Sequence, residues 1–289
     1  MSKKLFPETK YNFNIQQFIQ HAIAEDIGNG DHTSLACIPS NKRGRAQLIV
    51  KENAIIAGVE LANSIFKQVD KTLKVTTLIK DGTPVKKGDI VLRVEGKSHS
   101  ILLAERLVLN CMQRMSGIAS KTNIYTQLCK GTKAKVIDTR KTTPTIRGLE
   151  KWAVLIGGGT NHRIGLYDMI LIKDNHIDYT GGIQSAIEAA TNYLKVKKKK
   201  LSIEIEARNI KEVKEILATG KINRIMLDNF SYADTKKAVA LINGKYEIES
   251  SGGITEKTIR KYALCGVDYI SIGALTHHIK SVDLSLKAY

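Results

Sequence analysis

Cysteine pairs are missing from this chain of 289 residues. Its four cysteines lie far apart and form no Cys-x-x-Cys motif: Cys37, Cys111, Cys129 and Cys265. This pattern excludes the zinc sites that such motifs build and the disulfide framework of a small secreted protein. It is typical of a protein in a reducing compartment.

Long apolar segments are missing as well. No apolar run approaches the roughly 18 residues of a membrane span, and the first eight residues lack the apolar core of a signal peptide. We therefore expect a cytoplasmic protein with no membrane partner. Hydrophobic residues make up 43% of the chain and charged residues 25%, as in ordinary globular proteins, and the length allows about two domains.

Acidic residues are scarce. There are 28 of them against 45 Lys and Arg, which leaves a net charge of +17. Such an excess fits nucleic acid, an anionic surface or small anionic substrates. The densest basic run, 195–200, has no aromatic residues between its lysines to stack on bases. We interpret it as a solvated helix end or loop, and expect no nucleic-acid partner.

Cationic and hydrogen-bonding residues gather in three clusters between Asp138 and His176, at 138–144, 157–163 and 173–176. Arginine offers a planar fork of donors that matches carboxylates, and lysine is a point charge suited to phosphates. The glycines in the second cluster let backbone N–H groups approach a ligand closely. The clusters therefore predict a small polyanionic substrate.

From about residue 134 onward, the sequence repeats one pattern of strand-like and helix-like segments. Short β-branched apolar runs at 134–137, 169–172, 201–205, 222–227, 246–248 and 269–272 alternate with amphipathic stretches at 144–155, 181–195, 210–218, 231–242 and 255–264. This alternation predicts parallel strands joined by crossover helices. Because only six strands are visible, we expect an incomplete, six-stranded β/α barrel within the α/β class.

Polar residues follow each predicted strand. The carboxyl ends of barrel strands carry the chemistry in this architecture, and the loops after the last two strands commonly bind phosphate. Those two loops contain Ser251, Gly252 and Gly253, and then Gly273. The sequence thus places a phosphate site beside the cationic clusters.

The first hundred residues have a different pattern. Strand candidates at 45–51, 73–80 and 90–95 are separated by Gly-containing turns, which indicates an α+β sandwich domain over 1–115. A long helix at 102–130 leads into the barrel domain, which we place at 116–276. We expect the tail, about 277–289, to pack back on the first domain.

The motifs in order resemble those of quinolinate phosphoribosyltransferase over nearly the whole chain. They are Glu25-Asp26-Ile-Gly28-x-Gly30-Asp31-x-Thr33, Ala104-Glu105-Arg106-x-x-Leu-Asn110 with Ser116-Gly117-Ile118-Ala119, Asp138-Thr-Arg-Lys-Thr-Thr-Pro144, Gly158-Gly159-x-Asn161-His162-Arg163, Ile172-Lys173-Asp-Asn-His176, Leu227-Asp228-Asn-Phe230, Glu249-Ser-Ser-Gly-Gly253 and Ile272-Gly273-Ala-Leu-Thr276.

The resemblance implies transfer of a phosphoribosyl group from 5-phosphoribosyl-1-diphosphate (PRPP) to the ring nitrogen of quinolinate. Diphosphate and CO2 are released, and the product is nicotinate mononucleotide on the de novo route to NAD. The resemblance also implies a Mg²⁺ cofactor and a homodimer with shared active sites. Whether dimers assemble further into hexamers is left open.

The resemblance also assigns residues to the substrates. For quinolinate these are Arg140, His162, Arg163 and Lys173, with Arg106 acting in the partner subunit's site. For PRPP and its phosphates they are Lys141, Glu206, Asp228, Ser251, Gly252, Gly253, Gly273 and His277. Catalysis is assigned to Lys141, Lys173, Glu206 and Asp228, and Mg²⁺ is assigned to Glu206 and Asp228, partly through the substrate.

Several alternatives remain open at this point. Strand alternation puts Glu204 and Glu206 on one face, so either carboxylate fits the ribose and Mg²⁺ role. A same-fold enzyme acting on nicotinate or another acceptor would need fewer than three clamping arginines. A basic nucleic-acid-binding protein is the alternative from another class, and steep salt dependence of binding would reveal it. One detail departs from the family pattern, because Thr145 follows Pro144 where a glycine is usual.

Overall fold

The computed structural model describes residues 11 and 13–289. The first ten residues, on which part of the cytoplasmic expectation depends, lie outside the described residues. The chain forms two compact units. The first unit comprises the residues up to Asn123 together with 143–158 and 278–289, and the second comprises 124–142 and 159–277. The sequence placed its domain boundary at 115/116, whereas the units divide at 123/124, and both points lie inside helix α5 (Ser98–Leu128).

An antiparallel sheet forms the centre of the first unit, in the strand order β12-β1-β5-β3. Its strands are β1 (Arg43–Val50), β3 (Lys74–Thr77), β5 (Ile90–Lys97) and β12 (Leu284–Ala288), and a separate small pair joins β2 (Ala54–Ile55) to β4 (Pro84–Val85). The chain's tail thus belongs to this unit, because β12 pairs with β1 and sets Leu286 opposite Leu48.

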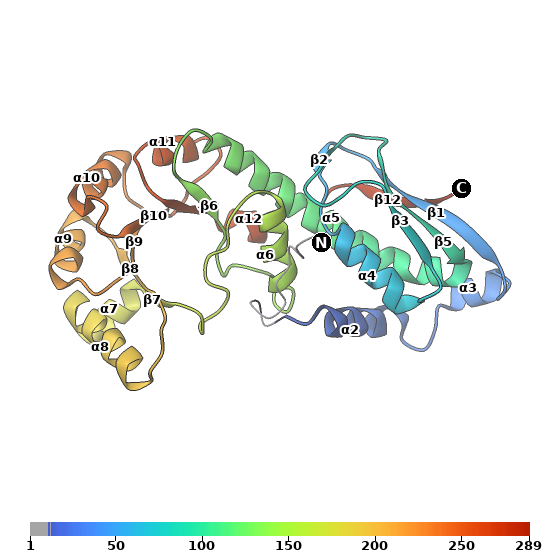
Figure 1. Cartoon of the computed structure of the whole chain (residues 1–289), viewed down its shortest axis with the longest axis horizontal. Coiled ribbons are helices and arrows are strands. Elements are labelled where there is room, and N and C mark those ends of the chain that lie inside the picture. The colour runs from blue at the N-terminus through green and yellow to red at the C-terminus, as the bar shows by residue number, and fades with distance from the viewer. Residues whose placement is uncertain (1–10, 12) are drawn as a thin grey trace. The chain divides into compact units, whose positions relative to one another are not determined.

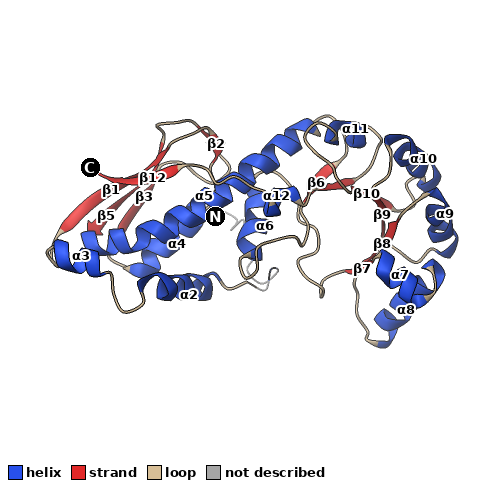
Figure 2. Ribbon diagram, turned by 180° about the vertical axis from the view of Figure 1, so that it is seen from behind, coloured by secondary structure: helices blue, strands red, loops and turns tan. Residues whose placement is uncertain are grey.

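Helices line one side of this sheet (Figure 2). They are α2 (Ile15–Ile27), α3 (His32–Cys37), α4 (Val59–Val69), and the long α5 (Ser98–Leu128). The carboxylate of Asp81 caps α4 from a distant turn, accepting hydrogen bonds from the N–H groups of Val59 at 2.9 Å and Glu60 at 3.1 Å. This satisfies two of the N–H groups that a helix start leaves without partners.

The helix that follows the first barrel strand, α6 (Arg147–Ile156), is not a crossover helix of the second unit, which corrects the sequence interpretation. It belongs to the first unit. Residues 148–154 are all buried, so the helix has no solvent face over that stretch. Glu150 holds it to α5 by accepting from Arg114 Nε at 2.8 Å.

A six-stranded parallel sheet forms the centre of the second unit, in the order β6-β11-β10-β9-β8-β7. Its strands are β6 (Lys135–Ile137), β7 (Ile170–Ile172), β8 (Ile203–Ala207), β9 (Arg224–Asp228), β10 (Glu247–Ser251) and β11 (Tyr269–Ser271). Within the described residues the end strands β6 and β7 do not pair with each other. The predicted fold class, an incomplete six-stranded barrel, is therefore confirmed.

Helices cover the outside of this sheet (Figure 1). They are α7 (Asp174–Thr180), α8 (Ile183–Val196), α9 (Ile210–Thr219), α10 (Tyr232–Ile242) and α11 (Ile259–Ala263). The short α12 (Ala274–His277) follows β11, and its Thr276 is bonded to the loop after β6. Asn209 and Ser231 cap α9 and α10, each side chain accepting from a backbone N–H three residues further along. These caps help fix where the strand-end loops stop and the helices start.

Strand register determines which side chains share the inward face of the sheet. In β8 and β9, Glu204 is opposite Arg224 and Glu206 is opposite Met226. Because side chains alternate along a strand, Glu204, Glu206, Arg224 and Asp228 all lie on one face, at different depths. Glu204 and Arg224 lie near the middle of the inward face, and Glu206 and Asp228 lie nearer the carboxyl edge of the sheet.

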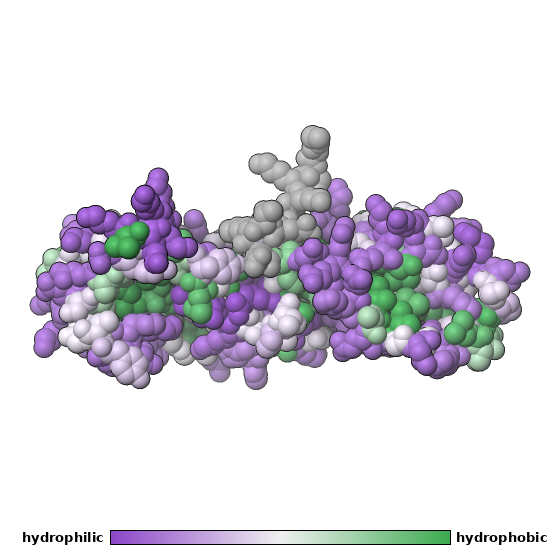
Figure 3. Space-filling view, turned by 90° about the horizontal axis from the view of Figure 1, so that it is seen from below, coloured by the Kyte–Doolittle hydropathy of each residue, from purple (hydrophilic) through white to green (hydrophobic). Residues whose placement is uncertain are grey.

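The face drawn in Figure 3 is mostly hydrophilic, with apolar side chains gathered in separate patches. Among the described residues, no helix combines the length and the apolar character needed to cross a membrane.

Thr145 adopts φ +67°, in the left-handed region that costs a β-branched residue roughly 1–2 kcal/mol. This is the position where the family pattern has glycine. We predict that Thr145→Gly raises the free energy of unfolding by about 1 kcal/mol, since relief of strain exceeds the added chain entropy. Urea unfolding measures this change. Thr145→Ala is the matched control, and an equal gain from alanine would contradict the strain account.

Candidate active site

Lys173 and Glu206 form an ion pair at the carboxyl edge of the second unit. Lys173 follows β7, and its Nζ lies 2.6 Å from Oε1 of Glu206 near the end of β8. The Glu206 side chain is only 10% exposed, whereas that of Lys173 is 45% exposed. The pair therefore offers one cation to the solvent side and one carboxylate to the interior.

The ends of β9 and β10 form a tight turn around Asn229. This residue has φ +55°; its Nδ2 donates to Asp228 Oδ2 at 2.8 Å, and its backbone N–H donates to the carbonyl of Ser251 at 2.9 Å. A Cβ at Gly252, which has φ +98°, would lie 2.9 Å from the backbone nitrogen of Asn229. Glycine is therefore required there, and the turn places the Asp228 carboxylate beside the Ser251 loop.

The loops after β6 and β11 also meet. Thr276 Oγ1 donates to the carbonyl of Lys141 at 2.7 Å. A Cβ at Gly273 would lie 3.1 Å from both His277 Nε2 and Lys141 Cδ. The structure thus brings together three residues that the sequence assigned to phosphate binding, namely Lys141, Gly273 and His277.

Arg163 follows a segment that the carboxylate of Asp138 holds in place. Asp138, which is fully buried, accepts from the backbone N–H of His162 at 2.9 Å and from Asn161 Nδ2 at 2.5 Å. The Arg163 guanidinium donates to the carbonyl of Met169 at 3.3 Å. Burial lowers the pKa of Arg163, and the positive charge of nearby Arg140 lowers it further. Two arginines are therefore held within reach of each other's charge.

His162 is buried, and both ring nitrogens have partners inside the chain. Its Nε2 lies 3.1 Å from Glu204 Oε2 and 3.4 Å from Glu249 Oε2, and its Nδ1 accepts from the backbone N–H of Arg163 at 2.7 Å. Burial opposes a charge on the ring, but the two carboxylates outweigh it and raise the pKa of His162 to about 9.

The carboxylates favour the charged ring, whereas the hydrogen bond that Nδ1 accepts from Arg163 favours the neutral ring and so opposes the rise in the pKa of His162. An Nδ1 that accepts carries no proton, so with this hydrogen bond made the ring is neutral and its one proton is on Nε2, facing the carboxylates. Burial and the Glu249 charge raise the pKa of Glu204, which lets that carboxyl share the proton. The prediction that His162 hydrogen-bonds quinolinate stays a prediction, with both nitrogens already engaged.

Depth separates the two candidate carboxylates of β8. Glu204 is fully buried and faces His162 and Arg224, whereas Glu206 lies two residues nearer the carboxyl end and contacts Lys173. Of the two carboxylates, Glu206 is thus the one that lies nearer the carboxyl edge.

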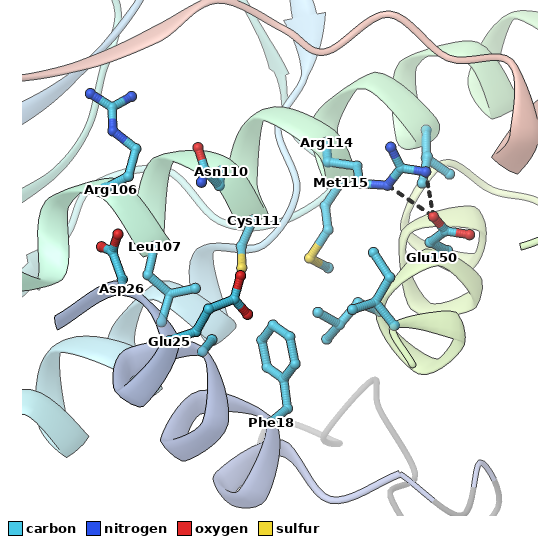
Figure 4. Close-up of a pocket in the computed structure, with 14 residues that line it drawn as sticks. Phe18, Glu25, Asp26, Arg106, Leu107, Asn110, Cys111, Arg114, Met115 and Glu150 are labelled. Carbon is cyan, nitrogen blue, oxygen red and sulfur yellow. Dashed lines mark hydrogen bonds and ion pairs between the residues drawn. The ribbon is translucent and has the colours of Figure 1, made fainter. Parts of the chain in front are cut away.

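Arg106 lies in the first unit, exposed on α5. It lines a cavity of about 480 Å³ with Glu25, Asp26 and Asn110 from the Glu25–Asp26 and Glu105–Arg106 motifs (Figure 4). Arg114 and Glu150 form an ion pair at another part of the cavity wall. The other predicted substrate residues all belong to the second unit.

Sequence reasoning missed two supporting residues: Asp138, which binds the Asn161 side chain and the backbone N–H of His162, and Thr276, which ties two loops together. His176 was left open between a cap and a place near the site, and it caps the start of α7, its Nδ1 accepting from the Lys173 N–H at 2.9 Å. Each of these residues lies inside one of the motifs named above, and that position was the only sequence signal for its role. The group to which each one bonds is known only from the structure.

The fold and the cationic carboxyl edge define an enzyme that binds small anionic substrates. Residues 31–116 match the model of the N-terminal domain of quinolinate phosphoribosyl transferase, and residues 118–287 match its C-terminal domain. The chain belongs to the quinolinate phosphoribosyltransferase family.

Relatives support this assignment over the full length. The chain is 45% identical to the Arabidopsis thaliana protein named nicotinate-nucleotide pyrophosphorylase [carboxylating], chloroplastic, covering 99% of this chain and 86% of that protein. It is 44% identical to the Nicotiana glauca quinolinate phosphoribosyltransferase [decarboxylating] 2, mitochondrial, covering 99% and 85%. The crystal structure of NadC from Streptococcus pyogenes superposes with a TM-score of 0.90 at 37% identity, covering 94% of this chain and 95% of that one.

The family fixes the reaction. The enzyme is a phosphoribosyltransferase that converts quinolinate and PRPP to nicotinate mononucleotide, diphosphate and CO2 in NAD biosynthesis, as the sequence predicted. The alternative of a nucleic-acid-binding protein is thereby set aside.

The relatives also correct one expectation. The sequence interpretation placed the protein in the cytoplasm, but proteins 44–45% identical to it are named chloroplastic or mitochondrial. The cytoplasmic prediction is therefore wrong, because a reducing pattern of cysteines and the absence of a membrane span are equally compatible with an organelle.

Proposed function

We propose that the carboxyl edge of the β6–β11 sheet is the catalytic site and that Arg140 and Arg163 bind the carboxylates of quinolinate. One observation carries this proposal: Arg140 and Lys173 follow the two end strands β6 and β7 at the carboxyl edge, and Asp138, which also follows β6, holds the backbone N–H of His162 next to the half-buried Arg163. The positive charge of nearby Arg140 lowers the pKa of Arg163, in keeping with this placement. Holding like charges together is unfavourable unless an anion comes between them. Quinolinate, with two carboxylates on one ring, supplies that charge.

The other cations and the glycine loops serve PRPP. Lys141 lies beside Gly273 and His277, and the Ser251–Gly252 turn lies beside Asp228. Gly252 and Gly253 have positive φ, and backbone N–H groups in such a turn form a concave site that suits a 5-phosphate. Lys173 lies between the two substrates. It follows β7, the strand that comes after Arg163 in the chain, and its ammonium contacts Glu206, which is one of the residues for PRPP.

In the reaction, the bond between C1 of the ribose and diphosphate breaks, and diphosphate leaves with the electron pair. The ring nitrogen of quinolinate then forms the new bond to C1. Glu206 and Asp228 orient the ribose hydroxyls, and the positive edge stabilises the departing charge, so positioning and fixed charges supply the rate. The ribosylated nitrogen is cationic and draws in the electrons of the bond to the 2-carboxylate. CO2 leaves, and a proton from solvent takes its place at C2.

Glu206 and Asp228 also fit a Mg²⁺ ion that accompanies PRPP. Both are carboxylates on neighbouring parallel strands and point to one face, and Mg²⁺ prefers such hard oxygens together with substrate phosphates. When bound, the ion neutralises charge on diphosphate. The interior carboxylates do not fit as well, because Glu204 and Glu249 are fully buried below the carboxyl edge, where the phosphates of a substrate do not reach them.

A steady-state assay with Mg²⁺, PRPP and either quinolinate or nicotinate tests the assignment. We predict that Arg163→Lys lowers kcat/KM for quinolinate by about 10²–10³-fold, because a point charge replaces a bidentate fork. Arg208→Lys is the matched control: this arginine follows β8 but pairs with Glu212 and Asp178, and its change should leave activity intact. Turnover of nicotinate and none of quinolinate would overturn the assignment.

We further propose that the enzyme is a homodimer in which Arg106 completes the partner subunit's site. Arg106 is exposed on α5 and lies on a unit that contains none of the other substrate residues. A third arginine fork matches the charge of a diacid that also faces an anionic co-substrate.

Mixing Arg106→Ala with Arg140→Ala subunits tests the shared site. Half of randomly exchanged dimers are mixed, and each has one site free of both changes, so activity should return to about a quarter of the wild-type value. Each variant alone should be nearly inactive. Subunit exchange shown by mass spectrometry without recovered activity would refute the proposal.

A further inference from the structure

A layer of charged side chains lies inside the second unit, below the carboxyl edge. It consists of His162, Glu204, Arg224 and Glu249, which we call the interior charge cluster. Glu204 and Glu249 are fully buried, the His162 side chain is 6% exposed and the Arg224 side chain is 14% exposed. The reaction steps described above assign no substrate contact to Glu204, Arg224 or Glu249.

The cluster is closely paired. Arg224 Nη1 lies 3.2 Å from Glu249 Oε2 and 3.8 Å from Glu204 Oε2, and the two carboxylates meet His162 Nε2 from the other side. Below them the guanidinium stacks on Tyr269 at 3.9 Å from the ring centre and pairs with Glu247 at 3.0 Å. Each carboxylate therefore has one cationic and one imidazole neighbour.

Neither metal binding nor stability accounts for this arrangement. His162, Glu204 and Glu249 offer ligand atoms within 4.8 Å of one another, a spacing that suits a cation. The guanidinium of Arg224, however, already supplies positive charge to both carboxylates and would repel a divalent ion. Buried ion pairs also seldom stabilise a fold more than apolar side chains of similar volume. Another role is needed to explain two fully buried glutamates.

The cluster holds the residue that precedes Arg163. Because the carboxylates face Nε2, the ring turns its Nδ1 to the backbone N–H of Arg163, at 2.7 Å. From the other side, Asp138 binds the backbone N–H of His162. The backbone from which the Arg163 side chain extends is thus fixed at two successive N–H groups, and the ring that holds one of them is fixed by Glu204 and Glu249.

We propose that Glu204 and Glu249 are positioning residues for the transferase reaction: they fix the His162 ring so that it holds the Arg163 backbone, and with it the guanidinium that binds a quinolinate carboxylate. This inference rests on the proposed role of Arg163. Loss of these carboxylates should therefore raise KM for quinolinate and leave KM for PRPP nearly unchanged, because Arg163 binds quinolinate and not PRPP. Small displacements of a binding group cost large factors in rate and affinity.

Glu204→Met removes the carboxylate while keeping the length of the side chain. We predict a rise of about 10–100-fold in KM for quinolinate, with KM for PRPP within about twofold of the wild type. Glu204→Gln keeps an oxygen that can accept from Nε2–H, so it should recover most of the loss. Quinolinate affinity by calorimetry should follow the same order.

The matched control is Glu247→Gln. Glu247 pairs with the same Arg224 but is half-exposed and does not contact His162, so both KM values should stay unchanged. If Glu204→Met does not fold, Glu249→Gln and Glu204→Gln combined remove both charges at nearly constant volume and carry the same comparison. Equal rises in both KM values, or a lower Tm with unchanged kinetics, would overturn the inference.

A double-mutant cycle separates this inference from the proposed function. In an Arg163→Lys background, Glu204→Met should add less than about threefold to the quinolinate KM, because the group it positions is already altered. Fully additive effects would overturn the inference alone. If Arg163→Lys by itself leaves quinolinate binding unchanged, the role of Arg163 fails and this inference fails with it.

Discussion

Pairing of charges on the inward face of a parallel sheet is the constraint on which the rest of this structure depends. The lower layer sets Glu204 and Glu249 against Arg224 and His162, and the upper layer sets Glu206 against Lys173. An unpaired charge in either layer would be costly, since burial removes its hydration. The alternation of side chains along each strand puts both layers on one face, so the lower layer can hold in position the residues that bind substrate at the carboxyl edge.

The overall charge of the protein does not explain substrate binding. The lysine run at 195–200 begins in the last turn of α8 and continues past its end, where exposed cations interact favourably with the helix dipole. By contrast, Arg163 is half-buried and anchored by the Asp138 network, as described above. A few cations held in place and partly desolvated bind an anion more strongly than many exposed ones.

Much of the fold followed from local pattern. The six β-branched runs became β6–β11 within a few residues, and the polar residues after them do lie at one edge, because parallel strands all end there. The unit to which α6 belongs could not be predicted. Its apolar pattern shows that the helix is buried, but it does not show which unit the helix packs against. Strand alternation puts Glu204 and Glu206 on one face, but only the register with β9 shows that Glu204 lies opposite Arg224 and Glu206 opposite Met226. Arg224 and Glu249 were missed as partners for the same reason, since their contact depends on strand order.

The most direct test of the central claim is a crystal structure with quinolinate bound. The account predicts the pyridine ring at the carboxyl edge of the β6–β11 sheet, with one carboxylate within hydrogen-bond distance of Arg163 and the other near Arg140, and with the His162 ring still held by Glu204 and Glu249. Quinolinate bound elsewhere, or bound at this edge with both arginines turned away from it, would contradict the account.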